Sequence, residues 1–269
     1  MPGLRTVLAV SAMLAAATVA GAAPKELSEE EVTAALMAHI AAHTRDGVFA
    51  FVDPLTGEHL ALVLDNVRVV RGLPGYGWFP NVNFHDAKTP ARKYALDFWL
   101  LPDDGGAAPK LIDARIHKAP QKDGDGWMSI TRRPMAWWWL PTIERASAVA
   151  RKPAWRVLGD IHMHIAKTRN GEAVALADET GAERSLQLID VEQPVGRSKA
   201  DGRYFACALL REPKTEPAAF YSAAYWLDDK TKQITAGKAA RVEMANTGDR
   251  KAASEPRCNV DGVNFDIVD

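Results

Sequence analysis

The chain contains one segment twice, and this internal repeat limits the possible folds more than any other feature. Arg45–Val67 and Arg169–Val191 align without a gap at a constant offset of 124 residues. The identical pairs at that offset are Arg45/Arg169, Gly47/Gly171, Thr56/Thr180, Gly57/Gly181, Leu62/Leu186, Leu64/Leu188 and Val67/Val191. With small gaps the match continues, for example from Ala114-Arg115-Ile116 to Ala240-Arg241-Val242. We interpret the pattern as a duplication that produced two copies of one module.

The repeat predicts how the 269 residues divide, since this length suits one large or two small domains. We expect a first module over residues 23–120 and a second module, with a C-terminal tail, over residues 154–269. A tryptophan-rich connector, residues 121–153, lies between them and contains Trp137, Trp138 and Trp139. This triplet is either an exposed aromatic patch for sugar or lipid headgroups or a plug between the modules. We favour the plug, because tryptophan is chiefly a large apolar filler.

The N-terminus has the pattern of a secretory signal peptide. Arg5 supplies the positive charge, Val7–Ala20 is apolar, and Ala20-Gly21-Ala22 resembles a cleavage site. The apolar run is too short to span a bilayer, and no later run is longer. We therefore predict residues 1–22 to be removed near Ala22, leaving a periplasmic or secreted protein without a transmembrane segment.

Cys207 and Cys258 are the two cysteines of the chain. An exported protein with two cysteines tends to pair them, so we predict a disulfide, with two buried thiols as the alternative. The predicted Cα–Cα separation is about 4.4–6.8 Å.

Local patterns predict one helix before each set of strands. Ser28 and Glu31 form a capping box for a helix that runs to about Thr44, and a second helix is expected over Ala154–Thr168. Alternating strands are expected at Val48–Val52, His59–Val70, Trp78–Asp86, Lys93–Leu101 and Lys110–Lys118, and again at Glu172–Ala177, Glu183–Val195, Arg203–Arg211, Phe220–Leu227 and Gln233–Met244. Further strands are expected at Trp127–Arg133 and in the tail at Val263–Val268.

These elements predict an α+β fold: a tandem duplication of a helix packed on a curved antiparallel sheet. The order of elements resembles cystatin-like and NTF2-like rolls. The resemblance concerns topology alone and implies no function.

Composition and motifs exclude several functional classes. A formal net charge of −1 provides no basic field, so nucleic acid is not an expected partner. No G-x-S-x-G, H-E-x-x-H, P-loop, G-x-G-x-x-G or C-x-x-C motif is present, and we expect no cofactor and name no catalytic residue. His39 and His43 have metal-compatible spacing, but we interpret them as histidines at the edge of the core. His162 and His164, two residues apart on a helix, point in different directions and cannot chelate together.

Strand alternation combined with the repeat indicates a candidate site. In the first module the even-numbered strand positions are apolar and should face the helix, so the odd-numbered positions project from the opposite face. The candidate ligand-binding residues on that face are Asn81, Asn83, His85, Asp97, Trp99, Arg115 and His117. The matching face of the second module is much less polar. Either the first copy keeps a site, or its face is simply solvated while the second is covered.

The leading hypothesis is an exported binding or accessory protein that uses this polar face, with an unknown small molecule or protein as its partner. Trp99 would provide an apolar platform and Arg115 would bind an anionic group. One alternative is a periplasmic hydrolase with His117 or His85 as general base, oriented by Asp97 or Asp113. Another is a purely structural protein–protein interaction module. We expect Arg115 to pair with Asp97 or Asp113, because a buried guanidinium needs a counter-ion.

Overall fold

The computed structural model describes residues 27–73, 75–102, 109–132, 153–213, 215–243 and 258–268. The predicted signal peptide, residues 1–22, lies outside these ranges, as do Trp137, Trp138 and Trp139.

The described part of the chain is mostly β, with two helices and two sheets. Strands make up 56% of it and helices 15%, so the predicted α+β tandem roll is wrong. The strands run further than their alternation suggested. The prediction ended strand β8 (Pro109–Asp123) at Lys118 and strand β11 (Glu183–Ser198) at Val195. The additional residues pair with neighbouring strands and enlarge both sheets beyond what one short helix can cover.

The two helices lie close to their predicted positions. Helix α1 is Glu29–Ala42, and Ser28 forms the predicted capping box, in which its hydroxyl accepts from the Glu31 amide while the Glu31 carboxylate accepts from the Ser28 amide. Helix α3 is Pro153–Thr168. Neither helix in the described ranges is long and apolar enough to cross a membrane.

The first sheet contains nine antiparallel strands. Besides β8 they are β1 (Thr44–Arg45), β2 (Val48–Val52), β3 (His59–Val69), β4 (Gly72–Leu73), β5 (Gly77–Trp78), β6 (Asn81–Asp86), β7 (Lys93–Pro102) and β9 (Gly126–Thr131). The main path is β1-β2-β3-β6-β7-β8, and β8 pairs with β9 only from Lys118 onward. Among the described residues, no strand pairs with the edge of β8 before that point on the side away from β7.

The second sheet contains seven strands. Besides β11 they are β10 (Ala173–Ala177), β12 (Tyr204–Glu212), β13 (Ala219–Leu227), β14 (Ile234–Ala236), β15 (Ala240–Val242) and β16 (Phe265–Val268). Its path is β10-β11-β12-β13, with β14 and β15 both on β13 and β16 on β11. Strand β16 corresponds to the strand predicted in the tail.

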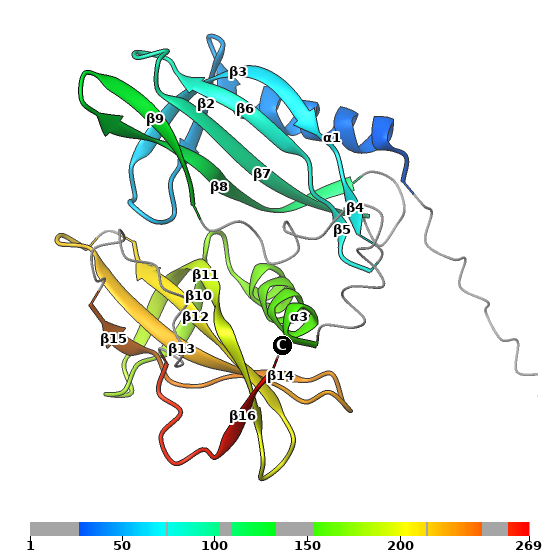
Figure 1. Cartoon of the computed structure of the whole chain (residues 1–269), viewed down its shortest axis with the longest axis vertical. Coiled ribbons are helices and arrows are strands. Elements are labelled where there is room, and N and C mark those ends of the chain that lie inside the picture. The colour runs from blue at the N-terminus through cyan, green and yellow to red at the C-terminus, as the bar shows by residue number, and fades with distance from the viewer. Residues whose placement is uncertain are drawn as a thin grey trace, which may run out of the picture.

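Helix α3 separates the two sheets, whereas α1 lies against the first sheet on the side away from the second (Figure 1). One stripe of α3, including Val157 and Ile161, belongs to the apolar core of the second sheet. The other side of α3 presents Met163 and Ala166 to Trp99 of the first sheet. Because both sides of α3 bury apolar area, the two sheets and this helix pack as consecutive layers.

The matched turns of the repeat share two local features. Gly57 and Gly181 both have positive φ, +74° and +87°, a conformation that favours glycine. Thr56 Oγ1 donates to Asp53, and Thr180 Oγ1 donates to Asp178. The identity of these turn residues therefore has a backbone reason in each sheet. Duplication of whole modules stays a prediction of the sequence.

Candidate functional site

The polar residues predicted to share a face of the first sheet lie opposite one another on neighbouring strands. Asn81 on β6 is paired in register with Asp97 on β7, and Asp97 with Arg115 on β8. Asn81 Nδ2 donates to Asp97 Oδ1 at 2.7 Å, and His117 Nδ1 lies 3.0 Å from Asp97 Oδ2. The strand register thus brings these four side chains together.

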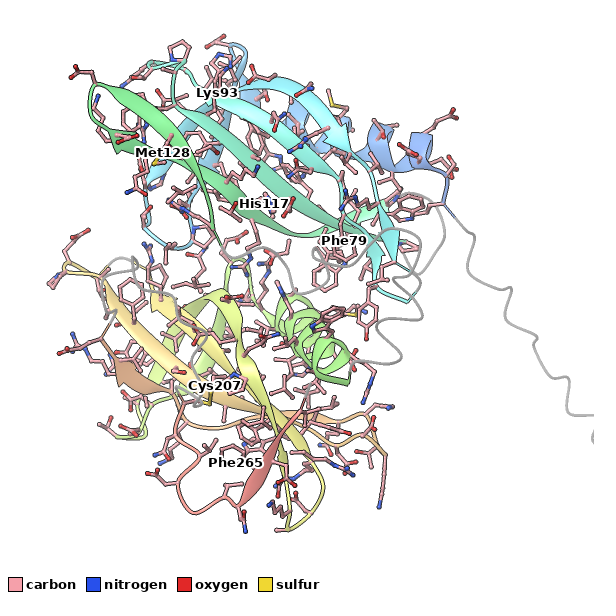
Figure 2. The ribbon with its side chains drawn as sticks, viewed as in Figure 1. Phe79, Lys93, His117, Met128, Cys207 and Phe265 are labelled. Carbon is pink, nitrogen blue, oxygen red and sulfur yellow. A yellow bond between two sulfur atoms is a disulfide. The ribbon has the colours of Figure 1, made fainter. Side chains whose placement is uncertain are left out.

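This face is buried rather than open. Asn81, Asp97 and Trp99 have no exposed surface, and Arg115 and His117 retain 7% and 6%. Phe79 stacks on Trp99 at a centroid distance of 5.7 Å and lies at the border between the first sheet and α3 (Figure 2). Trp99 packs against α3, and Arg115 donates to carbonyl oxygens of the second sheet, so these two residues take part in the packing between the sheets.

Asn83 and His85 lie further along β6 and are half-buried. Their partners are on β3: Asn83 donates to Asn66 Oδ1, and His85 Nδ1 lies 2.6 Å from Asp65 Oδ1. The structure does not bring these two residues to the interface with the second sheet.

Asp113 is the centre of a buried charge cluster between the two sheets. Arg115 Nε donates to Asp113 Oδ2 at 2.9 Å, which identifies Asp113 as the predicted counter-ion of Arg115. Arg169 Nη1 donates to Asp113 Oδ1 at 3.1 Å, and His162 Nε2 lies 2.7 Å from Asp113 Oδ2. Arg115 Nη1 also donates to the carbonyl oxygens of Leu188 and Ile189 in the second sheet.

A break in the pairing of β8 with β7 positions the side chains of this cluster. The register shifts between the pairs Trp99–Asp113 and Leu100–Leu111, so Ile112 is an extra residue in β8. Such a bulge redirects the neighbouring side chains and carbonyls. The Ile112 carbonyl accepts from Arg169 Nη2 at 2.6 Å, which joins the end of α3 to the bulge.

The charged groups in the cluster shift one another's pKa values. Burial raises the pKa of Asp113, but Arg115, His162 and Arg169 outweigh burial and hold that pKa well below its usual range. Burial lowers the pKa of His162, and the attraction of Asp113 offsets this only in part. The cluster is therefore built around an ionised carboxylate and a neutral imidazole.

A cavity of about 520 Å³ opens beside this cluster. Four consecutive residues of β2 (49–52) and six of β8 (110–115) line it. Successive residues of a strand point to opposite faces, so a cavity that touches all of them lies along the strand edges. The cavity is therefore the gap between the edge of β8 and the end of β2 beyond its pairing with β1, at Phe51 and Val52.

The walls of the cavity differ in character. His39, Phe49 and Phe51 form an aromatic wall on the side of α1, and Phe98, which has no exposed surface, packs behind them. Arg115, Asp113 and Arg169 form a charged wall on the side of the second sheet. Of the seven predicted ligand-binding residues, Arg115 lines this cavity.

The second sheet is closed at the equivalent place. Asp178, directly after β10, forms a parallel bridge with Ala239, directly before β15, and the Ala239 amide donates to the Ala177 carbonyl at 2.9 Å. By the repeat, Ala239 corresponds to Asp113. The open gap of the first sheet thus coincides with a charged residue where the second sheet has alanine.

The histidines weighed as metal ligands have other contacts. The rings of His39 and His43 lie 4.2 Å apart, and burial lowers the pKa of His39, with a smaller contribution from His43. His162 faces Asp113, whereas His164 packs edge-on against Tyr225 of the second sheet, as expected for residues two apart on a helix. Within the described ranges, no three His, Cys, Asp or Glu side chains are grouped so as to hold a metal ion.

The predicted disulfide is confirmed. Cys207 and Cys258 are bonded, with Cα atoms 5.4 Å apart. Both pack with Ala224, Trp226 and Val260, so the tail covers the face of the second sheet opposite α3 (Figure 2).

Sequence reasoning missed Lys110, Phe51, Arg169 and Glu172 as residues around one cavity. Period-two alternation assigns side chains to two faces and contains no information about a gap at the sheet edge. The signal available in the sequence was the acidic Asp113 of the first copy, where the second copy has Ala239.

No family model matches this chain, and neither a curated protein nor a solved structure was found to be similar to it.

Proposed function

We propose that this chain is an exported, non-catalytic binding protein that holds a small organic ligand in the cavity between β2 and β8. Export follows from the predicted signal peptide with cleavage near Ala22, and the disulfide agrees with an oxidising compartment. The polar face of the first sheet contributes to the site through Arg115, at its rim, while the buried remainder supports that wall.

One observation carries the proposal: the first sheet leaves open the gap that the second sheet closes. Closing such a gap satisfies strand-edge groups and buries apolar area, as the bridge between Asp178 and Ala239 does. An open gap gives up that stabilisation, which is expected where a ligand completes the structure.

The cavity has the size and composition of a small-molecule site. About 520 Å³ falls within the roughly 300–1,000 Å³ typical of ligand pockets. Such pockets combine apolar walls with a few oriented polar groups. Phe49 and Phe51, backed by Phe98, supply the apolar wall. Arg115, held by Asp113, supplies the oriented polar group.

The test is to fill the cavity from a position that does not disturb the core. Ala50 is the exposed middle residue of β2 and lines the cavity. Ala175 is the exposed middle residue of β10, in a strand with the same burial pattern. Ala50→Trp and Ala175→Trp therefore form a matched pair on an open and a closed sheet.

The measurement is native mass spectrometry of the protein purified from its own cells. We expect a bound molecule on the wild type and on Ala175→Trp, and its loss from Ala50→Trp. A wild type without any bound molecule, or equal retention by both variants, would contradict the proposal. Thermal unfolding of each variant separates loss of binding from loss of fold.

A further inference from the structure

A second cavity adjoins the first and extends the site toward the end of α3. It measures about 390 Å³ and shares Lys110, Leu111, Ile112 and Arg169 with the first cavity. The two cavities flank the same stretch of β8. The shared residues place the two cavities side by side, and their remaining lining residues differ in character.

We propose that the ligand is an amphipathic anion, with its apolar part in the first cavity and its anionic group in the second. This inference rests on the proposed function and specifies the class of ligand. It follows from the walls of the two cavities.

The apolar end of the site is aromatic. Phe49 stacks with Phe51 at a centroid distance of 6.3 Å and lies 6.4 Å from Phe98. His39, which packs edge-on against both Phe49 and Phe98, completes this wall. Such a wall favours an apolar chain or ring and contributes on the order of 25 cal/mol per Å² of apolar surface buried.

The other end of the site is cationic. Lys110, Lys167 and Arg169 line the second cavity, and its remaining lining residues carry no charge. Lys110 and Lys167 are exposed, and neither ammonium group has a hydrogen-bond or ion-pair partner within the described ranges. Arg169 is held in place by Asp113 and by the Ile112 carbonyl. An oriented guanidinium that lines the same cavity as these two ammonium groups favours a carboxylate, sulfate or phosphate.

The acids of the first cavity do not reverse this preference. Both oxygens of Asp113 accept hydrogen bonds from arginines. Glu172 is 75% exposed at its side chain and lies 3.7 Å from Arg169. The charge of Asp113 is therefore balanced by arginines, and the Glu172 carboxylate lies beside the Arg169 guanidinium.

A different role for Lys167 must be distinguished by experiment. It lies in the last turn of α3, where a cation interacts favourably with the helix dipole. That role predicts an effect of Lys167→Gln on stability without an effect on ligand choice. Lys110, on β8, has no such role, so the two lysines are substituted both singly and together.

The experiment compares three probes with the same ten-carbon chain: decanoate, decanol and decylamine. Binding of each to the purified full chain is measured by isothermal titration calorimetry below the micelle-forming concentration. We expect decanoate to bind at least about tenfold more tightly than decylamine, with decanol between them. The variants are Lys110→Gln, Lys167→Gln, their combination, and Lys230→Gln, an exposed lysine in the turn after β13, as the charge-matched control.

The double variant should weaken decanoate about tenfold and leave decanol within about twofold of wild type, while Lys230→Gln changes neither. Equal binding of all three probes, blocked by Ala50→Trp, would overturn the inference and leave the proposed cavity standing. Weakening of decanoate by Lys230→Gln as well would show a general charge effect and would also overturn it. If no probe binds, the ligand class is wrong, and the bound molecule seen by native mass spectrometry remains the separate test of the proposed function.

Discussion

The two sheets are built in the same order yet differ at the same place. In each, a helix precedes the strands, and a turn with matched glycine and threonine residues joins two neighbouring strands, β2 and β3 or β10 and β11. The first sheet remains open between β2 and β8, whereas the second closes through Asp178 and Ala239. The first sheet turns a polar face toward its neighbour, and the second covers its corresponding face with a disulfide-linked tail.

This difference shows how one pattern of strands can support two roles. An alanine before β15 allows the backbone of the second sheet to close. Asp113 at the matching position recruits two arginines and a histidine, and these occupy the space beside the gap. The charged cluster joins the two sheets and at the same time forms one wall of the cavity.

The largest effect is expected from Asp113→Ala. This substitution gives the first sheet the alanine that the second sheet has at the matching position. Arg115 and Arg169 would lose their buried counter-ion, and removing one partner of a buried ion pair costs up to about 5 kcal/mol. We expect this loss in the free energy of unfolding measured by urea denaturation. Asp65→Ala, which removes a partly exposed acid paired with His85 and Lys93, should cost less than about 1 kcal/mol. Similar losses in the two variants would contradict a central role for Asp113.

In the second sheet, the disulfide is the counterpart of the Asp113 cluster of the first sheet. Cys258→Ser opens a loop of 51 residues and should lower the free energy of unfolding by about 4 kcal/mol in oxidising buffer, because the unfolded chain gains conformational entropy. Thermal unfolding with and without reductant is the measurement. Under reductant the wild type and the variant should unfold at nearly the same temperature, and a persistent gap would count against the entropic explanation.

Substitutions in the two matched turns distinguish local backbone strain from contact between the sheets. Gly181→Ala should cost about 1 kcal/mol, because alanine at positive φ is strained and a Cβ there meets nothing within 4 Å. Gly57→Ala has the same backbone strain, and its Cβ would overlap the guanidinium of Arg211 in the second sheet. We therefore expect a loss of about 2 kcal/mol at Gly57. Chemical denaturation of both variants gives the comparison, and equal costs would mean that Arg211 moves aside freely.

The smallest effect concerns the pH dependence of the interface. Burial holds the pKa of His162 below its unfolded value of about 6.5. Below that pH the unfolded chain takes up a proton that folded His162 resists, so stability falls as the pH falls. Replacing His162 with glutamine should reduce the slope of stability between about pH 7 and 5, by at most about 1.4 kcal/mol per pH unit.

Unfolding free energies measured at several pH values test this expectation. His39 and His164 also have pKa values lowered by burial, so part of the slope should remain in His162→Gln. A slope unaltered by His162→Gln would show that this histidine does not resist protonation.

Local elements followed closely from the sequence, but the fold class did not. The capping box at Ser28, the stripe of α3 and the alternation of β6 each depend on neighbours within a few residues, so their patterns can be recognised in the sequence. The α+β prediction failed because the extension of β8 and β11 depends on pairing with β9 and β16, and alternation alone does not reveal it.

The candidate site was likewise predictable only in part. The sequence by itself determined which odd-numbered residues of β6, β7 and β8 share a face and that Arg115 needs an acid, because side-chain alternation and charge burial are local rules. Only the tertiary structure decided that α3 and the second sheet cover this face, and that the gap between β2 and β8 remains open beside Asp113. The curvature of a sheet and the meeting of its two end strands depend on contacts between residues far apart in the chain, and these arise only when all the layers pack together.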